Sequence, residues 1–454
     1  MGSVVIAPES RRSLTEAPPQ CNAPSGPTAR QIIDGGGIIT HFQPIFSAKQ
    51  KSVIGVEALS RGVNPENRSL IPPNALFEMA AAEQVTWELE HLCRQTALQT
   101  FANLRGGQEN LLLFLNFDAS SLDAGPASEG GLLFINFDPS VAETGVDVAN
   151  GFLRRVTQLG LDPGRIAVEI LESKFNNLQR LEEVLCAFRQ CGFLLAIDDV
   201  GAGHSNLDRI PLIRPDIIKV DRSLITRIDG DYHKQETFKS LAQLARRIGA
   251  LVVAEGVETK MEALISLELG ADLLQGFYLA RPRPAEALEA AMAGDAVQAL
   301  ARDYKSYMVS KINQRKLQHR RYNIILNTIL CELNRTTVDA FDPVMLEAIR
   351  PYPMVECVYV LDEAGIQVSD TVCNPAAPTG RRGSKGLMFK PALKGADHSL
   401  KEFYYVLLDV ELQKYTTDPY VSLATGNVCR TISTCFRDAG NCKMYILCID
   451  VISE

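Results

Sequence analysis

The chain has 454 residues, 46% of them hydrophobic and 22% charged, and a formal net charge of −8 at pH 7. This length suffices for two or three domains. The acidic balance argues against DNA binding and against broad attraction to anionic membranes. No apolar run approaches the roughly 18–20 residues needed to cross a bilayer, and no signal peptide is evident. The 11 scattered cysteines fit reduced thiols better than a disulfide framework. We therefore expect a soluble, cytoplasmic protein.

Residues 1–30 are rich in Pro, Ser and Ala, and we expect them to be disordered. From residue 31 to residue 290, apolar runs alternate with amphipathic, helix-like segments. Runs that are apolar throughout indicate strands buried on both faces, and hence a parallel sheet. About eight strands in this length is typical of a (β/α)₈ TIM-like barrel, with a doubly wound open sheet as the alternative. The expected strands are HFQPIFS, SVIGVEALS, LLLFLNF or GLLFINF, RIAVEI, FLLAIDD, DIIKVD, LVVAEG and LLQGFYLA.

Two local patterns modify this plan. Only a short polar turn separates the first two strands, which predicts a hairpin and not a crossover. An internal repeat follows, because residues 111–121 read LLLFLNFDASS and residues 131–141 read GLLFINFDPSV. Asn136 is followed by one helix and then by RIAVEI, whereas a second strand intervenes after Asn116. We therefore place Asn136 in the barrel and interpret one copy as an insertion.

The sequence pattern changes after residue 290. Residues 291–336 contain a long stretch without Pro or Gly, which predicts a connecting helix that could pair with a second copy. Residues 337–454 mix turns with short expected strands and predict a small α/β domain. Its cysteines 429, 435, 442 and 448 form no close CxxC pair, so we interpret them as buried small residues, with a redox or metal role as the alternative. The strands expected here are VECVYVLD, YYVLLDV, YVSLATG and MYILCIDV.

Polar side chains follow the expected strands of the first region where each strand ends. Because the C-terminal ends of barrel strands meet at one rim, we expect these side chains to converge. The set contains five carboxylates, opposed by Lys219 and by Arg61 of EALSR. Its members are Glu57, Asn136, Glu169, Asp198, Asp199, Lys219, Glu255 and Gln275.

Such crowding is unfavourable, since two like charges about 4 Å apart repel by roughly 4 kcal/mol at an effective dielectric near 20. Protonation or cations could relieve it. A set of oxygen donors without histidine or cysteine favours Mg²⁺ or Mn²⁺ over zinc. The adjacent Asp198 and Asp199 could reach two ions, and paired ions suit phosphodiester cleavage because they activate water near neutral pH. Lys219 could then stabilise charge on the phosphoryl oxygens.

Each motif alone also has a simpler interpretation. Asp198 and Asp199 before Gly201 could form an Asx turn that caps a helix. Lys219 could be a strand-end lysine, and Glu169 with Glu172 could mark a helix N-terminus. Only their joint occurrence on successive strands points to a site.

Across about residues 38–284, the sequence resembles the EAL family of cyclic di-GMP phosphodiesterases. The resemblance implies a modified (β/α)₈ barrel whose first strand runs antiparallel. It also implies hydrolysis of cyclic di-GMP to linear pGpG with Mg²⁺ or Mn²⁺. The segments that carry it are FQPIF, GVEALSR, FINFDPS, VEILES, AIDDVGAGHSNL, RPDIIKVDRSLI, VVAEGVET and QGFYLARP.

The resemblance also assigns roles. Lys219 would orient the attacking water, with Glu255 as the alternative group assisting that water and Glu57 as the third catalytic residue. Glu172 would steady the loop DVGAGHSN, in which Val200 and His204 depart from the usual aromatic residues. We expect His204 to be a loop packing residue and not a general acid. The implied metal ligands are Glu57, Asn136, Glu169, Asp198, Asp199, Glu255 and Gln275, and the implied nucleotide contacts are Gln43, Leu59, Arg61 and Asp221.

Residues 337–452 resemble the Cache (PAS-like) sensor domains of bacterial signalling proteins, through VYVLDEAGIQVSDTV, YTTDPYVSLATG and MYILCIDV. No GGDEF-like segment is present, so we do not expect synthesis of the dinucleotide. We predict a homodimeric phosphodiesterase whose C-terminal domain receives a small-molecule or protein signal. The alternatives are an inactive cyclic di-GMP receptor and a protein-interaction scaffold.

Overall fold

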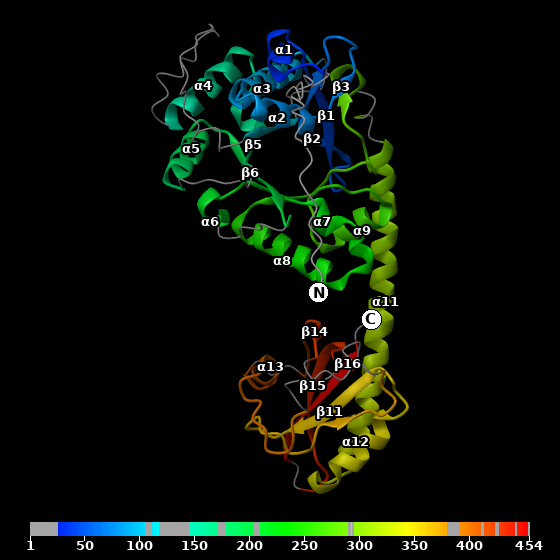
Figure 1. Cartoon of the computed structure of the whole chain (residues 1–454). Coiled ribbons are helices and arrows are strands. Elements are labelled where there is room, and N and C mark those ends of the chain that lie inside the picture. The colour runs from blue at the N-terminus through cyan, green and yellow to red at the C-terminus, as the bar shows by residue number, and fades with distance from the viewer. Residues whose placement is uncertain are drawn as a thin grey trace, which may run out of the picture. The chain divides into compact units, whose positions relative to one another are not determined.

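A computed structural model describes residues 26–104, 111–117, 145–170, 178–202, 209–288, 292, 295–378, 391–409, 413–422, 426–440 and 443–452. The chain forms two compact units, Met1–Met308 and Val309–Glu454 (Figure 1). Each unit has its own hydrophobic core.

The first unit contains a closed barrel. In the described part of the chain, its strands follow the order β1, β9, β8, β7, β6, β5, β4, β2, and β2 closes the barrel by pairing with β1. β1 is antiparallel to both neighbours, while the other adjacent pairs are parallel. The expected hairpin and the modified barrel are therefore confirmed. The strands are β1 (Ile38–Ser47), β2 (Ser52–Val63), β4 (Leu112–Phe117), β5 (Ile166–Ile170), β6 (Leu194–Val200), β7 (Ile217–Val220), β8 (Leu251–Ala254) and β9 (Leu273–Leu274), with short β3 (Leu70–Ile71) and β10 (Arg283–Pro284) at the margins.

The strand between β2 and β5 is the first copy of the internal repeat. Its residue Asn116 lies in register with Glu169 of β5. Our expectation that the second copy occupies this position was wrong. It assumed that each barrel strand leads directly into its helix, whereas residues 118–144, which include the second copy, separate β4 from α4. Asn136 itself lies outside the described residues.

Helices surround the barrel strands (Figure 1). Two helices follow β3 and not one, because Gln84 adopts a left-handed φ of 59° between α2 and α3. α8 and α9 end at left-handed glycines, as their sequences predict. The helices are α1 (Ala29–Asp34), α2 (Pro73–Ala82), α3 (Thr86–Ala102), α4 (Gly145–Gln158), α5 (Leu178–Gln190), α6 (Ile210–Ile213), α7 (Arg222–Ile225), α8 (Tyr232–Ile248) and α9 (Lys260–Leu269), with single 3₁₀ turns at Pro163–Arg165, Ile228–Gly230 and Ala285–Ala287.

The long connecting helix is α11 (Asp295–Leu333). Its first part packs on α9 within the first unit: Tyr304 donates a hydrogen bond to the carbonyl of Leu267 at 3.3 Å, and Lys260 pairs with Asp303 at 2.6 Å. Its last turns contribute Ile325 to the core of the second unit. No helix in the described ranges is both long enough and apolar enough to cross a membrane.

The second unit is a small α/β domain built on an antiparallel sheet of order β12-β11-β16-β15-β13, with β14 beside β15. Its two faces alternate along β11, so that Val358 faces the core formed with α12 while Tyr359 faces the core formed with α13. Residues 404–409 of YYVLLDV, predicted as a strand, lie in α13; short apolar runs do not distinguish strand from helix. The elements are α12 (Phe341–Ile349), β11 (Val355–Leu361), β12 (Val372–Cys373), α13 (Glu402–Asp409), β13 (Lys414–Thr416), β14 (Tyr420–Val421), β15 (Val428–Arg437) and β16 (Met444–Ile452), after a 3₁₀ turn at Val338–Ala340.

Candidate functional site

A buried lysine lies at the centre of the predicted rim. The Nζ atom of Lys219 is 2.6 Å from Glu169 Oε1 and 2.7 Å from Glu255 Oε1. The same atom is 3.0 Å from Asp198 Oδ1 and 3.5 Å from Glu57 Oε2. Lys219 is 1% exposed and Glu169 is fully buried. Three carboxylates from strands and a fourth, directly after β8, therefore share one ammonium group.

The period of the strands explains this convergence. Ala167, Ala196, Ile217 and Val253 belong to the cluster that fills the barrel interior. Side chains alternate along a strand, so the residue two positions later faces the interior one layer closer to the C-terminal rim. The rule applies to further interior residues as well. Two positions after Phe114, Ala167, Ala196, Ile217, Val253 and Leu273 stand Asn116, Glu169, Asp198, Lys219, Glu255 and Gln275.

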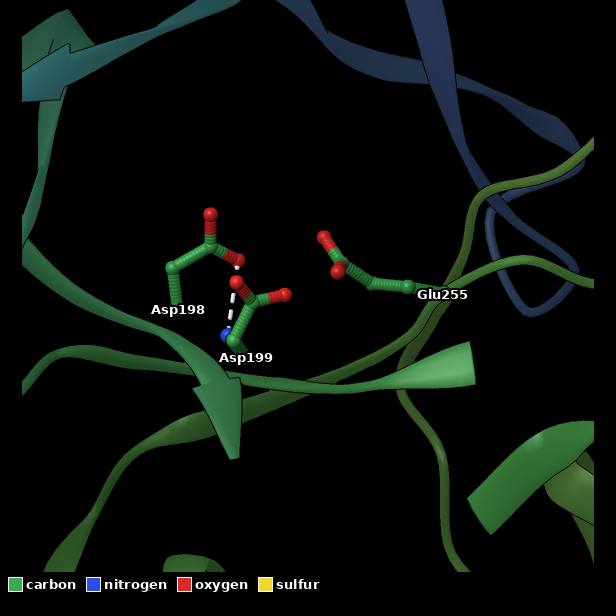
Figure 2. A group of neighbouring side chains, drawn as sticks. All are labelled: Asp198, Asp199 and Glu255. Carbon is green, nitrogen blue, oxygen red and sulfur yellow. Dashed lines mark hydrogen bonds between the residues drawn. The ribbon is translucent and has the colours of Figure 1, made fainter. Parts of the chain in front are cut away.

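The paired aspartates require an irregularity in β6. In a regular strand, adjacent side chains point to opposite faces. The register of β6 with β7 shifts between Ile197 and Val200, and Asp199 has a left-handed φ of 55°. The Asp199 amide donates a hydrogen bond to Asp198 Oδ1 at 3.0 Å. As a result, one carboxylate oxygen each from Asp198, Asp199 and Glu255 lies within 4.8 Å of the others (Figure 2).

Amide side chains hold the carboxylate of Glu57 from two sides. Gln275 Nε2 donates to Glu57 Oε2 at 2.6 Å and to Gln43 Oε1 at 3.3 Å. Asn116 Nδ2 donates to Glu57 Oε1 at 3.3 Å. Asn116 was not among the predicted site residues, because Asn136 of the second repeat copy was selected in its place. Its position directly after an apolar run, which matches that of Asn136, was the feature that could have identified it.

Electrostatics at this rim shift several protonation equilibria. Burial raises the pKa of Glu169 and of Glu255 well above the usual range. Lys219 opposes this shift, and the neighbouring carboxylates add to it. Burial also raises the pKa of Asp199 to about 6, reinforced by Asp198 and Asp221. For Lys219, burial disfavours the charge, but the four carboxylates outweigh it and hold its pKa well above normal.

The donor set fits a hard divalent cation. Every potential ligand atom in the cluster is a carboxylate or amide oxygen, and carboxylates outnumber the single lysine. Within the described ranges, the buried Gln275 Oε1 and Glu169 Oε2 atoms have no hydrogen-bond partner. Unsatisfied buried oxygens are costly in a native protein, and a cation would satisfy them. Among the described residues, those that could hold one are thus Glu57, Asn116, Glu169, Asp198, Asp199, Glu255 and Gln275.

The cluster opens into a cavity with three lining side chains that the sequence analysis did not single out: Arg222, Glu258 and Phe277. They stand two or three positions after Lys219, Glu255 and Gln275, and so follow the rim residues into the adjoining loops. That spacing was the available signal. The complete lining is Gln43, Glu57, Asp198, Asp199, Lys219, Arg222, Glu255, Gly256, Glu258, Gln275, Gly276 and Phe277.

The other predicted residues lie around this cavity or outside the described chain. Leu59 and Arg61 continue β2 beyond Glu57, and both are half-buried. Burial lowers the pKa of Arg61 from its ordinary value, partly offset by Glu57. Asp221 caps α7 by accepting a hydrogen bond from the Ser223 amide at 2.8 Å. None of these three residues is among the cavity lining. Glu172, His204 and Asn136 fall outside the described residues.

Comparison with known proteins adds a family match. The EAL domain model matches residues 28–282, which is more than half of the chain. The chain is 24% identical over 424 residues to the EAL-domain containing protein YkuI of Bacillus subtilis, covering 90% of this chain and 93% of that protein. The crystal structure of YkuI in complex with cyclic di-GMP and calcium superposes with a TM-score of 0.71 at 20% identity, over 94% of this chain and 99% of that one. The two share a fold.

Two further relatives match a little more than half of this chain. The bifunctional diguanylate cyclase/cyclic di-GMP phosphodiesterase MucR of Pseudomonas aeruginosa is 29% identical over 271 residues, or 58% of this chain. The cyclic di-GMP phosphodiesterase NbdA of the same organism is 28% identical over 262 residues, or 57% of this chain. The alignments span 36% of MucR and 31% of NbdA, about a third of each.

Proposed function

The chain belongs to the EAL domain family, and on this premise we propose that its barrel hydrolyses cyclic di-GMP to linear pGpG with Mg²⁺ or Mn²⁺. The observation that carries the proposal is the rim itself, where Lys219 contacts four carboxylates beside an oxygen-only cluster in an open cavity. The cyclic di-GMP phosphodiesterase activities by which MucR and NbdA are named support the same substrate.

We propose that the cations are held by the carboxylates and amides of the rim. When bound, a pair of divalent ions supplies a hydroxide-like nucleophile near neutral pH and neutralises charge on the phosphoryl oxygens. Asp198, Asp199 and Glu255 form the nucleus of this proposed set, because their oxygens already lie close together. The remaining proposed ligands are Glu57, Asn116, Glu169 and Gln275; Asn116, whose side chain contacts Glu57 and which lies in register with Glu169, replaces Asn136 in the predicted set.

The chain's own groups have separate roles in the proposed reaction. The water oxygen forms a bond to phosphorus while the bond from phosphorus to the O3′ atom breaks, and O3′ leaves with a proton. Lys219 contributes a fixed positive charge next to Glu255 and Asp198, where it can orient the water and stabilise charge on the phosphoryl oxygens. Glu255, whose Oε1 atom is 2.7 Å from Lys219 Nζ, is the alternative group assisting the water. Glu57 keeps the rim assembled through its amide partners.

Nucleotide recognition is proposed for residues at the mouth of the barrel. Gln43 lines the cavity, and Leu59 and Arg61 extend β2 away from the barrel interior. Asp221 directs its carboxylate to the start of α7, two residues after Lys219. Glu172 is proposed to steady the loop that follows Asp199.

We further propose a cytoplasmic homodimer in which the C-terminal region is a Cache/PAS-like regulatory domain with a small-molecule or protein signal. In this proposal residues 1–30 are a disordered lead-in, 31–290 the phosphodiesterase barrel, 291–336 the connecting helix and 337–454 the regulatory domain. The packing of α11 on α9 supports a regulatory path, because α9 lies between Glu255 and Gln275 in the chain.

A cyclic di-GMP receptor without turnover is the second candidate. The specific observation in its favour is the repeated segment after Asn116, which inserts a second LLFIN-type sequence next to a proposed ligand. In a scaffold that binds no nucleotide, nothing would offset the repulsion among the carboxylates of the rim. No feature of the cavity favours the scaffold function.

One product assay separates these functions. Full-length protein is incubated with Mg²⁺ and cyclic di-GMP, and pGpG is quantified by chromatography while binding is measured by calorimetry. The proposal expects pGpG, with Glu57→Gln inactive and the exposed Glu183→Gln on α5 unchanged as a matched control. Binding without pGpG would establish the receptor, and the absence of binding would leave only the scaffold.

A further inference from the structure

Arg222 occupies a prominent place in the cavity wall. It is the first residue of α7, three positions after Lys219, and it lines the cavity. Its Nη2 atom is 2.9 Å from Glu258 Oε1, and its side chain remains 58% exposed. A guanidinium group has five N–H donors, so this ion pair leaves donors for a ligand.

The backbone next to Glu255 holds the stem of Arg222. Gly256 has a left-handed φ of 62°, and a Cβ atom placed on it would lie 2.5 Å from both Cβ and Cγ of Arg222. The methylene groups of Arg222 therefore lie directly against the Gly256 backbone. Together with the ion pair to Glu258, this contact bridges the loops that follow β7 and β8. The guanidinium is consequently held in place before any ligand arrives.

The charges of the cavity lining identify the Arg222 guanidinium as the candidate for binding an anion. The two cations of the lining are Lys219 and Arg222, against five carboxylates. Lys219 is buried and contacts four carboxylates at the rim, where the proposed cleavage takes place. Arg222 is the lining cation that an incoming anion can reach. Cyclic di-GMP has two phosphodiester groups, each with one negative charge, and the proposed ions act on the one that is cleaved.

We propose that Arg222 binds the second phosphodiester group of cyclic di-GMP, the one that is not cleaved. This inference rests on the proposed function and adds a substrate-binding residue to it. Arginine suits the task because its planar fork can donate two parallel hydrogen bonds to one phosphate. Arg222 thereby fixes the ring of the dinucleotide while chemistry occurs at the other phosphate. Its contribution is to binding, so its loss raises KM and Kd and not the chemical barrier.

The test removes the charge while keeping the stem. Arg222→Met retains methylene groups against Gly256, and Arg222→Lys retains the charge without the fork. We expect the KM for cyclic di-GMP to rise about tenfold for Met and about threefold for Lys, with kcat within twofold of wild type. Calorimetry with Ca²⁺ should show the same increases in Kd. Arg247→Met on the exposed surface of α8 is the matched control and should change neither constant.

The outcomes are distinguishable from failure of the proposed function. If wild type binds the dinucleotide without hydrolysing it, the hydrolase proposal fails while the Kd values of the variants still decide the role of Arg222. Unchanged KM and Kd in Arg222→Met would overturn the inference. Salt separates a phosphate contact from a guanine contact, because added salt should shrink the difference between wild type and Arg222→Met. A difference that is independent of salt would mean that Arg222 contacts a neutral base edge, and the phosphate assignment would be wrong.

Discussion

Replacing Lys219 with methionine should destabilise the barrel strongly in the absence of divalent ions. The ammonium group lies within 3.0 Å of Glu169, Glu255 and Asp198, and it is 1% exposed. Methionine has a similar shape but no charge, so the carboxylates lose their common counter-ion without a large change in volume. Removing one partner of a buried ion pair typically costs about 3–5 kcal/mol.

Protonation limits the size of this effect and makes it depend on pH. The variant can relieve the repulsion by binding a proton at one carboxylate, which at pH 7 costs about 3–4 kcal/mol for a group with an ordinary pKa near 4.3. At pH 5.5 the same step costs only about 2 kcal/mol. Because the variant raises carboxylate pKa values in the folded state, its stability falls as pH rises. The deficit should thus be about 3–4 kcal/mol at pH 7 and about half of that at pH 5.5.

Urea unfolding with EDTA measures this deficit. Trp87, the single tryptophan, lies in α3 of the first unit, so its fluorescence reports on the barrel. The midpoint should fall while the m-value stays constant. Adding Mg²⁺ should recover part of the loss, because a cation replaces the missing charge. Lys239→Met, at a partly exposed site 3.8 Å from Glu236, should cost less than about 1 kcal/mol. A Lys219→Met protein as stable as wild type at pH 7 would refute the idea that this lysine holds the carboxylates together.

Four further outcomes are expected. Glu57→Ala should lower kcat for cyclic di-GMP about a thousandfold, measured by pGpG release, because it removes a buried carboxylate held by two amides; turnover near the wild-type rate would show that the ligand assignment is wrong. EDTA should abolish hydrolysis and Mn²⁺ or Mg²⁺ should restore it, whereas activity that survives chelation would exclude the metal-dependent proposal. Gly256→Ala should lower stability by about 1–3 kcal/mol and raise KM, since its methyl group collides with the stem of Arg222; a neutral effect in unfolding experiments would contradict the packing. Asp450 accepts hydrogen bonds from Thr431 and Cys357, and burial raises its pKa. The stability that this group contributes at low pH is therefore lost as the pH rises above about 4. Asp450→Asn should stabilise the second unit by about 1 kcal/mol at pH 8 and not at pH 4, measured by circular dichroism, without a shift in tryptophan fluorescence.

The residues of the rim could be predicted because barrel geometry converts sequence into position. Knowing that the interior repeats with a period of two, a reader can place Glu169, Asp198 and Lys219 on one layer from the apolar residues that precede them. The hairpin of β1 and β2 was equally accessible, since its turn is too short for a crossover. These predictions depend on local periodicity and on the closure of the barrel, which brings all strand ends to one rim.

What the sequence did not reveal depends on competition between similar segments or on side-chain packing. Two nearly identical segments competed for one barrel position, and the simplest crossover selected the wrong one, although Asn116 is the residue in register with Glu169. YYVLLDV contains residues suited to a strand, but its residues 404–409 lie in a helix that packs Leu407 against the sheet. The Arg222 contact with Gly256 exists only once two loops are brought together.

The conformation of Asp199 gives a separate reason to expect a cation. A left-handed φ costs a non-glycine residue about 1 kcal/mol or more, and asparagine or glycine would accept it more readily than aspartate. The bulge also brings two carboxylates close together at a partly buried position, where burial and the charge of Asp198 raise the pKa of Asp199 to about 6. Both penalties disappear with an ordinary strand end. A chain that retains them must recover the energy elsewhere, and coordination of a divalent ion by Asp198, Asp199 and Glu255 would supply it. The same argument predicts that Asp199→Gly stabilises the metal-free barrel while weakening its affinity for Mg²⁺, and a glycine variant that gains stability without losing affinity would show that the bulge serves another purpose.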